Sequence, residues 1–488
     1  MDNFVGRKNE IQLINQLWGN ERSDLFILTG RRRVGKTRLL THWLGKNPET
    51  GFYWMAEKTS SVGQLRSFSR ALFKFLYDAE APTDFKYSDW EQALTALSAH
   101  AKKNKKACLF IDEVTYIIDA DPSFPALMQK LWDHNLKSSQ LLIGLSGSQQ
   151  GLIEKHFIQM SAPMYGRISQ HMHLQPLPFN ATSQFFPKYS SDERLLLYSI
   201  LGGIPEYWER IDKKLSVIDN LKDKILPSYG WMADEARILI QDYVKDENLF
   251  VAVLRALATD LSRNKDIAEH AGIENNKVSF YLKKLQDTKF VVREVPITKA
   301  ANPPRNAGRH ILVDPFLRFY HRYISPNASY LAMRKVDEIL DMIQEEMDES
   351  FLTPAWAQIC REWMLNESLN AKWGQIVYVG DEWNSGGNLN VVGVGDDILV
   401  LGHAFLQKTE ESEAVFDQFI RAAEKITLKN KEIYILLFAN SGWTQSAREA
   451  SHIIVDSLTQ SKKLSSGWDI KALNLLSLED VDSSLATS

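Results

Sequence analysis

One stretch decides the fold of this chain of 488 residues: LFILTGRRRVGKT, residues 25–37. Its apolar first part, Leu25 to Leu28, is typical of a buried parallel strand. The strand runs directly into GRRRVGKT, which has the spacing GxxxxGKT, and helix-forming residues follow. In this setting Gly30 and Gly35 let backbone N–H groups wrap phosphate oxygens. The sequence therefore predicts a strand, a phosphate-binding loop and a helix, the core of an α/β nucleotide-binding fold.

The side chains of this loop indicate how a nucleotide would be held. We expect Lys36 to reach the β and γ phosphates of ATP and Thr37 to ligate Mg²⁺, while the following helix adds its positive N-terminal end. The arginines at positions 31 to 33 either contact phosphate or a partner, or are solvated loop charges, and both interpretations remain open. The predicted nucleotide-binding residues of this stretch are Gly30, Arg33, Val34, Gly35, Lys36, Thr37 and Arg38.

A second motif lies on two further apolar runs. Residues 107–111 end in Asp112 and Glu113, where the aspartate can hold the Mg²⁺ shell and the glutamate can activate the attacking water. Residues 141–145 deliver Ser148 to the same edge of the sheet, where it either senses the γ phosphate or forms an ordinary turn. We predict that the loop and the acid pair lie on adjacent strands, and that the chain is a Mg²⁺-dependent ATPase.

Length, composition and charge limit the other classes of protein. A chain of this length predicts about three domains. Hydrophobic residues make up 44% and charged residues 24%, as in ordinary globular proteins. The net charge of -4 argues against a uniformly basic nucleic-acid coat, so any such contact needs a local patch. Cys108 and Cys360 are expected as buried thiols, and the chain shows neither a leader nor an apolar run of membrane-spanning length, so we expect a cytoplasmic protein without a membrane partner.

Together these motifs resemble the archaeal-type P-loop ATPases, relatives of the AAA+ and STAND groups. The opening segment, Phe4-Val-Gly-Arg-Lys-Asn-Glu10, is similar to the FxGRxxE segment of that family. The resemblance implies adenine contacts around Val5, Gly6 and Arg7.

Two further segments carry the resemblance. Pro163-Met-Tyr-Gly-Arg167 is similar to the family's PLYGR segment, which implies that Arg167 reads the γ phosphate, in cis or from a neighbouring subunit. A surface ion pair is the alternative for this arginine. Gly202-Gly-Ile-Pro-Glu-Tyr207 is similar to the GGxPxY lid segment, which implies that Pro205 rigidifies a helix junction over the nucleotide. A simple helix stop at the two glycines is the alternative here.

The middle of the chain is predicted to hold a lid followed by a winged helix. Between residues 174 and 244 a helical pattern interrupted by prolines suits a small lid. Three helical runs then have the spacing of a helix-turn-helix, and two short apolar runs can pair as a wing. These five runs are residues 250–258, 264–272, 275–285, 290–295 and 309–313.

Positive side chains on this winged helix predict contact with DNA. Contacts between these side chains and phosphate would give salt-dependent and largely unspecific binding. Docking of a protein partner, including a second copy of the chain, is the alternative use of such a module. The predicted DNA-binding residues are Lys277, Lys283 and Lys284 on the third helix, with Lys299, Arg305 and Arg309 on the wing.

The last third predicts a second, mixed α/β domain. Thr353 and Pro354 are typical of a helix start, and a hairpin of two apolar strands around a Gly-Asp turn follows at residues 387–405. A helix near residues 412–426, strands near 433–438 and 472–476 and a helix between these strands complete the pattern. This arrangement resembles the PD-(D/E)XK nuclease-fold domain that often follows such ATPases.

The acidic residues of that nuclease family are missing here. The family's acid pair falls on Asn388 and Asn390, and its E-x-K falls on the residues from His403 to Phe405. Glu362 alone remains as a possible family acid. Mg²⁺ is a hard cation that favours anionic oxygen, so we predict a domain that does not cleave DNA. Asp396, Asp397 and Lys408 are the candidates for migrated catalytic groups.

We therefore predict an α/β protein: a P-loop NTPase parallel sheet with a helical lid, a winged helix and a C-terminal restriction-endonuclease-like α/β domain. Its predicted function is to couple ATP binding and hydrolysis to engagement of DNA or a partner. A nucleotide-gated docking switch without DNA contact, and an ATP-dependent nuclease with migrated catalytic residues, are the alternatives. The predicted boundaries are 1–175 for the ATPase core, 176–246 for the lid, 247–324 for the winged helix, 325–345 for a linker and 346–488 for the nuclease-like domain.

Overall fold

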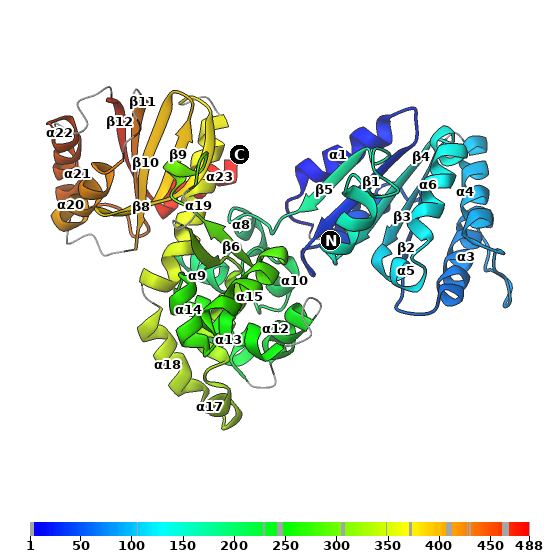
Figure 1. The fold of residues 1–488 in the computed structure, drawn as a ribbon, viewed down its shortest axis with the longest axis horizontal. Coiled ribbons are helices and arrows are strands. Elements are labelled where there is room, and N and C mark those ends of the chain that lie inside the picture. The colour runs from blue at the N-terminus through cyan, green and yellow to red at the C-terminus, as the bar shows by residue number, and fades with distance from the viewer. Residues whose placement is uncertain are drawn as a thin grey trace. The chain divides into compact units, whose positions relative to one another are not determined.

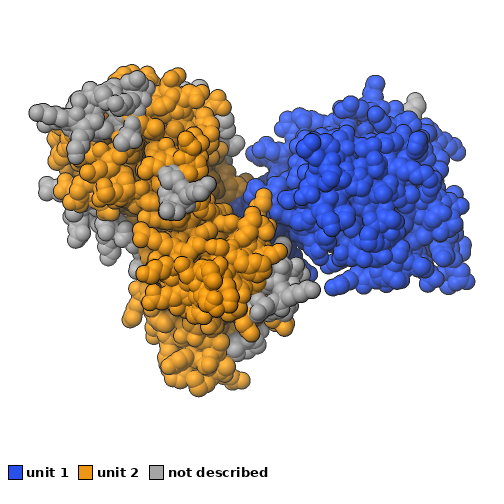
Figure 2. Space-filling model, viewed as in Figure 1, with its two compact units in different colours: residues 1–177, 204–207 blue, residues 178–203, 208–488 orange. Residues whose placement is uncertain are grey.

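The computed structural model divides by its internal contacts into two compact units, coloured separately in Figure 2. Unit 1 comprises Met1–Leu177 and Ile204–Tyr207, and unit 2 comprises Pro178–Gly203 and Trp208–Ser488. The finer division of unit 2 into lid, winged helix and nuclease-like domain remains a prediction. The structure describes residues 4–104, 106–227, 230–241, 247–303, 308–347, 349–369, 373–406, 412–426, 428, 431–460 and 468–487, so the predictions on Arg305 and Lys408 lie outside the described residues.

Unit 1 is built on a five-stranded parallel sheet with the strand order β2-β3-β4-β1-β5 (Figure 1). The two predicted motifs follow β1 and β3, and β4 lies between these two strands. The prediction that the motif strands are adjacent is therefore wrong. All residues of β4 are buried, as are those of β1 and β3, so its apolar sequence suits a central place equally well. The strands are β1 Asp24–Gly30, β2 Gly51–Met55, β3 Ala107–Asp112, β4 Leu141–Gly147 and β5 Gln170–Leu174.

The helices of unit 1 bury apolar stripes against this sheet. Helices α3, α4 and α6 lie together on one face in Figure 1, and their buried side chains share one apolar core with β2, β3 and β4. At the sheet centre, the rings of Phe26 and Phe110 meet edge to face at 5.9 Å. A Cβ on Gly144 would lie 2.4 Å from the Phe26 ring, so this glycine makes room for the pair. The helices are α1 Lys8–Gly19, α2 Lys36–Gly45, α3 Ser61–Tyr77, α4 Trp90–Asn104, α5 Val114–Ala120, α6 Phe124–His134, η1 Leu136–Ser138, α7 Gln150–Ile153 and η2 Glu154–Ile158.

Unit 2 begins with short helices in the predicted lid region. A capping box between Ser190 and Glu193 starts helix α9, because each side chain accepts a hydrogen bond from the backbone N–H of the other. Arg194 of α9 forms a buried, bidentate ion pair with Asp482 of the C-terminal helix, at 3.1 and 2.5 Å. The lid region and the C-terminal helix are thus joined within unit 2. The helices of this region are α8 Ala181–Phe185, α9 Ser191–Leu201, α10 Pro205–Glu209, α11 Val217–Asn220, η3 Leu221–Ile225 and α12 Trp231–Gln241.

Three helices and an antiparallel two-stranded ribbon follow, in the order predicted for a winged helix. Gly272 ends the second helix with a left-handed φ of 65°, a conformation that glycine adopts without strain. The third helix buries Val278, Leu282 and Leu285 against the other two. The elements are α13 Glu247–Ala258, α14 Asn264–Ala271, α15 Asn275–Asp287, β6 Val291–Glu294, η4 Ile297–Lys299, β7 Arg309–Leu312, α16 Pro315–Phe319, η5 Tyr320–Ile324, α17 Ala328–Ala332 and α18 Val336–Glu346.

The chain ends in a second five-stranded sheet, with the order β12-β11-β10-β9-β8. Strands β8, β9 and β10 are antiparallel, whereas β10, β11 and β12 are parallel, and the helices around this sheet confirm the predicted α/β domain. In Figure 1, α20, α21 and α22 cover one face, and α19 and α23 lie on the other. The elements are α19 Glu349–Leu369, β8 Ile376–Asn384, β9 Gly387–Gly395, β10 Ile398–Phe405, α20 Ser412–Ala423, β11 Lys431–Ala439, α21 Gln445–Ala450, α22 His452–Gln460, β12 Trp468–Ser477 and α23 Leu478–Thr487.

The first helix of this domain starts earlier than predicted. Helix α19 begins at Glu349 and contains Pro354, whereas the sequence pattern placed its start at Thr353. A proline inside a helix leaves the carbonyl four residues earlier without its usual N–H donor. Here that carbonyl belongs to Ser350, and it accepts a hydrogen bond of 2.6 Å from Arg318 Nη2. The arginine supplies the missing donor, so the helix can extend before its proline.

Two predictions from composition also concern the fold. Cys108 and Cys360 are free and buried, as predicted, and burial raises the pKa of the Cys108 thiol to about 12. Among the described residues, no helix is both long and apolar enough to cross a membrane.

Candidate functional site

The phosphate-binding loop predicted from the sequence connects the central strand β1 to helix α2. Gly30 and Gly35 have φ angles of 151° and 100°, which L side chains rarely adopt. A Cβ on Gly30 would also lie 2.7 Å from the carbonyl oxygen of Leu174, so there is no room for a side chain. Both glycines are thus required by the course of the backbone. Val34 is buried in the loop, and Arg38 is exposed on the first turn of α2.

Lys36 extends back across the loop that precedes it. Its Nζ donates hydrogen bonds to the carbonyl oxygens of Gly30, at 3.0 Å, and Arg31, at 3.2 Å. The side chain is buried, and burial lowers the pKa of Lys36, while the nearby carboxylates of Glu113 and Asp112 raise it. A cation in this position faces the concave side of the loop, where the phosphates of a nucleotide are expected.

Asp112 brings together the end of β3 and the first turn of α2. Thr37 Oγ1 donates to Asp112 Oδ2 at 2.5 Å, so the two predicted Mg²⁺ ligands are in contact. Both supply the hard oxygen atoms that Mg²⁺ prefers, and their contact fits two positions of one coordination shell. Tyr53 donates to the same carboxylate at 2.8 Å, and Ser146 donates to its other oxygen. The residues present therefore fit a Mg²⁺ ion.

Tyr53 and Ser146 were not predicted as site residues. Tyr53 lies on β2, next to β3 in the sheet, and burial raises the pKa of its hydroxyl, which therefore remains a donor. Ser146 lies on β4, the strand between the two motifs, two residues before Ser148. A polar side chain within an otherwise apolar strand is the signal in the sequence that could have identified both.

Glu113 and Ser148, both predicted as catalytic residues, are also in contact. One carboxylate oxygen of Glu113 accepts hydrogen bonds from the backbone N–H of Ser148, at 3.2 Å, and from its hydroxyl, at 3.1 Å. Glu113 has a φ of 53° and a ψ of 44°, an uncommon left-handed conformation for a residue other than glycine. Such backbone conformations concentrate at active sites and ligand clamps.

The opening segment contacts the phosphate-binding loop through Arg7. Arg7 Nη2 donates to the carbonyl oxygen of Val34 at 3.0 Å, and its Nη1 contacts Glu10 at 3.2 Å. Gly6 and Arg7 have positive φ angles of 73° and 63°, and the half-buried Val5 precedes them. The side chain of Arg7 therefore binds the backbone of the phosphate-binding loop. An adenine contact of this segment remains a prediction.

Arg167 is held in a surface ion pair. Its guanidinium contacts both carboxylate oxygens of Asp133, at 2.9 and 2.7 Å, and Nη1 donates to the carbonyls of Pro163 and Tyr165. Hydrogen bonding to Asp133 raises the pKa of the arginine. The observed contacts thus match the ion-pair alternative, and a role of Arg167 toward the γ phosphate remains a prediction.

The third helix of the predicted winged helix presents its lysines at the surface. Lys277 pairs with Glu274 at 2.8 Å and Lys283 pairs with Asp287 at 3.2 Å, both within the same helix or its cap. Lys284 is exposed as well. Phe280 lies three residues from both Lys277 and Lys283, and its side chain is 59% exposed. This exposed aromatic residue was not predicted. Residues three apart lie on the same face of a helix, so the spacing of Phe280 from the two lysines is the signal that could have predicted its exposure.

The predicted wing, in contrast, contacts strand β8 of the C-terminal sheet within unit 2. The guanidinium of Arg309 lies 4.4 Å from the centre of the Trp383 ring on β8. Glu382, next to this tryptophan, accepts hydrogen bonds from the backbone N–H and the hydroxyl of Thr298, at 3.1 and 2.8 Å. An aromatic face of the C-terminal sheet therefore contacts the cation of Arg309, and a contribution of Arg309 to DNA contact remains a prediction. Lys299 remains exposed on η4.

One of the two positions of the missing acid pair is filled by a side chain that binds the backbone. Asn390 is buried and exchanges two hydrogen bonds with the backbone of Ala404, at 3.2 and 2.8 Å. Burial lowers the pKa of His403 to about 4, and its ring packs against Phe405 at 4.4 Å. Glu362 accepts from Gln358 at 3.1 Å, and burial raises its pKa. Among the described residues, no three histidine, cysteine or acidic side chains gather as a possible metal site.

Comparison with known proteins begins with solved structures. A Walker-type ATPase of Pyrococcus abyssi is 19% identical, with a TM-score of 0.47, and the match covers 65% of this chain and 96% of that one. The ORC2 protein of Aeropyrum pernix, solved with ADPNP and ADP, is 11% identical, with a TM-score of 0.40, and the match covers 71% of this chain and 98% of that one.

Sequence comparison finds relatives in Methanocaldococcus jannaschii. An uncharacterized protein of this organism is 25% identical over 396 residues, which cover 81% of this chain and 85% of the relative. An uncharacterized ATP-binding protein of the same organism is 46% identical over 41 residues, which cover 8% of this chain and 70% of the relative.

Two family models match separate parts of the chain. Residues 320–405 match a family of archaeal and bacterial proteins of unknown function. Residues 4–211 match an ATPase domain found predominantly in Archaea, and these residues include the phosphate loop, the acid pair and the GGxPxY segment. Residues 4–211 of the chain are therefore similar to the ATPase domain that occurs predominantly in Archaea.

Proposed function

We propose that the chain is a Mg²⁺-dependent ATPase whose nucleotide state controls the engagement of DNA or a partner by unit 2. The observation that carries this proposal is the contact of Thr37 with Asp112, beside the buried Lys36 and the oriented Glu113. These four side chains come from two separate motifs, and the fold brings them to one edge of the parallel sheet. The match of residues 4–211 to an ATPase domain found predominantly in Archaea supports the same conclusion.

Each of these side chains has a distinct task in the proposed hydrolysis. Lys36 binds the β and γ phosphates, and Thr37 and Asp112 hold Mg²⁺, which when bound offsets the negative charge of the phosphates. Glu113 orients the attacking water and accepts its proton. The two hydrogen bonds from Ser148 fix one carboxylate oxygen of Glu113, which leaves the other oxygen for the water.

Phosphate release by the purified chain tests this proposal. We expect release from ATP in the presence of Mg²⁺ and its loss when EDTA removes the metal. A Lys46→Ala variant serves as the control for Lys36→Ala, because Lys46 is exposed on unit 1 and its replacement changes the net charge by the same amount. If the wild type releases no more phosphate than a Lys36→Ala preparation, the proposal that the chain is an ATPase is contradicted.

For the output, we propose DNA contact through helix α15 rather than through the wing. The helix exposes three lysines and Phe280, whereas Arg309 of the wing is engaged by Trp383. Lysines supply phosphate contacts, and an exposed phenylalanine supplies an apolar contact to a thymine methyl group or a base face. A gel shift with duplex DNA at two salt concentrations tests this proposal. DNA binding that does not weaken at the higher salt would exclude phosphate contact as its source, and an absence of binding would favour protein docking.

For the C-terminal domain, we propose a nuclease-like fold kept for binding or assembly rather than for cleavage. The hydrogen bonds of Asn390 to Ala404 support this proposal, because they use the side chain that would replace a catalytic acid. An amide at this position lacks the negative charge that Mg²⁺ favours. Incubation of the purified chain with DNA and Mg²⁺ tests this proposal, and cleavage would contradict it.

A further inference from the structure

The segment between Gly202 and Trp208 leaves unit 2 and returns to it within a few residues. Trp208 is fully buried, and its Nε1 donates to the carbonyl oxygen of Gly202 at 2.7 Å, so the two ends of the segment are pinned together. Gly202 has a φ of 61°, and a Cβ there would lie 3.3 Å from Pro315. The base of this projection is thus fixed by a hydrogen bond and by close packing.

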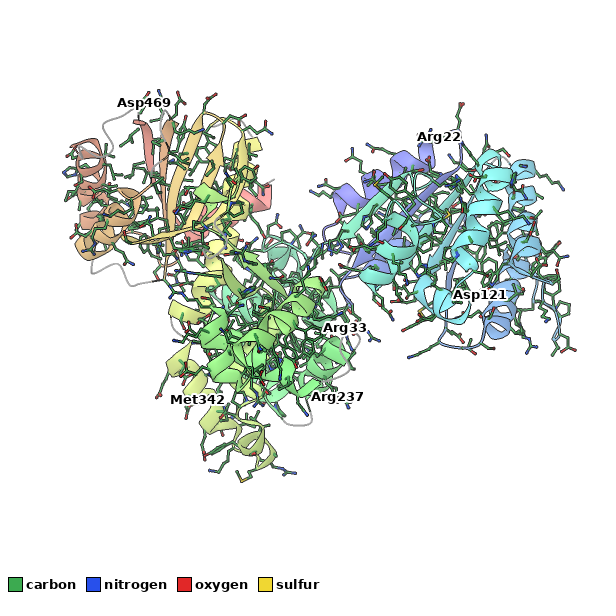
Figure 3. All side chains as sticks on the ribbon, viewed as in Figure 1. Arg22, Arg33, Asp121, Arg237, Met342 and Asp469 are labelled. Carbon is green, nitrogen blue, oxygen red and sulfur yellow. The ribbon has the colours of Figure 1, made fainter. Side chains whose placement is uncertain are left out.

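The residues at its tip, Ile204–Tyr207, belong to unit 1, where they contact the phosphate loop. Arg31 Nη2 donates to the hydroxyl of Tyr207 at 3.1 Å, and its guanidinium lies 5.3 Å from the centre of that ring. Arg33, which is labelled in Figure 3, forms an ion pair with Glu206. These arginines are two of the variable positions of the GxxxxGKT motif, which is why the sequence left their partner open.

A third contact reaches the glycine at the start of helix α2. A Cβ built on Gly35 would lie 3.9 Å from Cγ of Pro205, which begins helix α10. The proline ring therefore sits at van der Waals distance beside the loop, as the GGxPxY resemblance implied for the nucleotide site. At the tip of the projection, Glu206 and Tyr207 thus contact the loop, and Pro205 lies close to it.

We propose that Glu206 and Tyr207 are positioning residues of the nucleotide site, which set its affinity by holding Arg33 and Arg31 and so fixing the backbone of the phosphate loop. This inference rests on the proposed nucleotide site, and it adds that nucleotide binding there is coupled to the segment between Gly202 and Trp208. Neither residue touches the nucleotide in this proposal. We name the four side chains Arg31, Arg33, Glu206 and Tyr207 the loop latch.

The backbone of the loop explains why such a latch is needed. Arg33 has a φ of 67°, an uncommon left-handed conformation for a residue with a side chain, and an ion pair to Glu206 favours it over extended alternatives. A loop held in its phosphate-binding conformation binds more tightly, because less ordering accompanies binding. Thermodynamic linkage makes the effect reciprocal, so phosphate binding must stabilise the tip of the projection by the same factor. The latch would thus report nucleotide occupancy to the GGxPxY segment.

Isothermal titration of the full chain with Mg²⁺ and ADP tests the first half of this inference. ADP is not consumed, so the measurement does not depend on hydrolysis. We expect Glu206→Ala to weaken ADP binding by about three- to tenfold, the range for a partly exposed charged hydrogen bond, and Tyr207→Phe to weaken it less. Glu209→Ala, an exposed carboxylate on the same helix, is the matched control and should bind like the wild type.

A double-mutant cycle separates positioning from a general loss of structure. Because Glu206 acts through Arg33, Glu206→Ala should have no further effect in an Arg33→Ala chain. Hydrogen exchange at residues 203–208 should slow on addition of ADP in the wild type and remain unchanged in Arg33→Ala. Additive effects of the two substitutions, or unchanged affinity in Glu206→Ala, would overturn the latch. Failure of the wild type to bind ADP would overturn the nucleotide site itself, and the latch with it.

Discussion

The edge of the ATPase sheet and the hairpin of the C-terminal sheet are alike in one respect: each is a position where polar side chains follow buried strands. At the ATPase edge Asp112 and Glu113 remain carboxylates, and hydroxyl groups of Thr37, Ser146 and Ser148 donate to them. In the hairpin the corresponding acids are asparagines. The first region keeps anionic oxygen and surrounds it with small donors.

The difference lies in what the polar groups bind. The two side-chain atoms of Asn390 bind the backbone of the neighbouring strand, so this group is part of the sheet's own hydrogen bonding. Asp112 is a carboxylate, and it accepts hydrogen bonds from the hydroxyl groups of Thr37, Tyr53 and Ser146 as well as from the backbone N–H of Glu113. A hard cation favours negatively charged oxygen, and of these two positions Asp112 is the one that supplies a carboxylate.

The largest expected effects concern the ATPase edge. We predict that Lys36→Ala abolishes ATP binding, because the phosphates lose the cation that faces them. Glu113→Gln should retain binding and lower the hydrolysis rate by about 10²- to 10⁴-fold, the usual contribution of a general base. Titration with ATP and a phosphate-release assay measure the two quantities. Hydrolysis by Glu113→Gln at the wild-type rate would assign the water-activating role to another residue.

The sequence predicted this edge well because its chemistry is local. The spacing of Gly30, Gly35 and Lys36 defines the loop without any distant partner, and an acid pair after an apolar run defines its counterpart. The position of β4 between the motif strands could not be predicted, because a parallel crossover can place a strand on either side of its neighbour. The contact of Tyr53 with Asp112 depends on the pairing of β2 with β3, and the sequence analysis assigned no strand to β2.

Partners from distant parts of the chain account for other contacts that the sequence did not predict. The capture of Arg309 by Trp383 joins residues that are far apart in the sequence, and their spacing gives no sign of it. Likewise, the extension of α19 before Pro354 depends on Arg318, which a local helix rule does not consider. The hairpin turn, in contrast, is fixed by local sequence, and β9 and β10 meet at the predicted Gly-Asp turn.

The second prediction extends the comparison to a third polar surface, the exposed side of α15. Replacing Lys277, Lys283 and Lys284 with glutamate should weaken binding to unrelated DNA sequences and flatten the salt dependence by about one unit per lost phosphate contact. The new acids at 277 and 283 would also face Glu274 and Asp287, which now pair with the lysines. Fluorescence anisotropy with two duplexes of different sequence, over a range of salt concentrations, measures both effects.

A control with the same change of charge keeps this prediction specific. Lys46, Lys58 and Lys86 are exposed on unit 1, and their replacement with glutamate changes the net charge equally. This control should bind DNA like the wild type. Equal weakening by both triple variants would mean that overall charge, rather than α15, governs binding.

The third prediction restores one carboxylate to the hairpin. Asn390→Asp removes the donor to the Ala404 carbonyl and places an acid against it, so we expect a loss of about 1–3 kcal/mol in the stability of the C-terminal domain. Asn388→Asp, two residues earlier on the same strand and half-buried, is the matched control and should lose less. Urea denaturation followed by tryptophan fluorescence compares the two. A greater loss in Asn388→Asp would show that the backbone bonds of Asn390 are not what holds this strand.

The smallest expected effect is none at all: the chain should not cleave DNA, and Asp396→Ala or Asp397→Ala should change nothing. Strand β9 ends at Gly395 and β10 begins at Ile398, so both acids lie in the turn. Six residues of extended strand separate Asp396 from Asn390, a distance of about 20 Å, whereas ligands lie about 2 Å from a shared Mg²⁺. Incubation with Mg²⁺ or Mn²⁺, ATP and several forms of DNA is the measurement. Cleavage that disappears in Asp396→Ala or Asp397→Ala would show that catalytic groups have migrated to the turn, and that the hairpin resembles the ATPase edge after all.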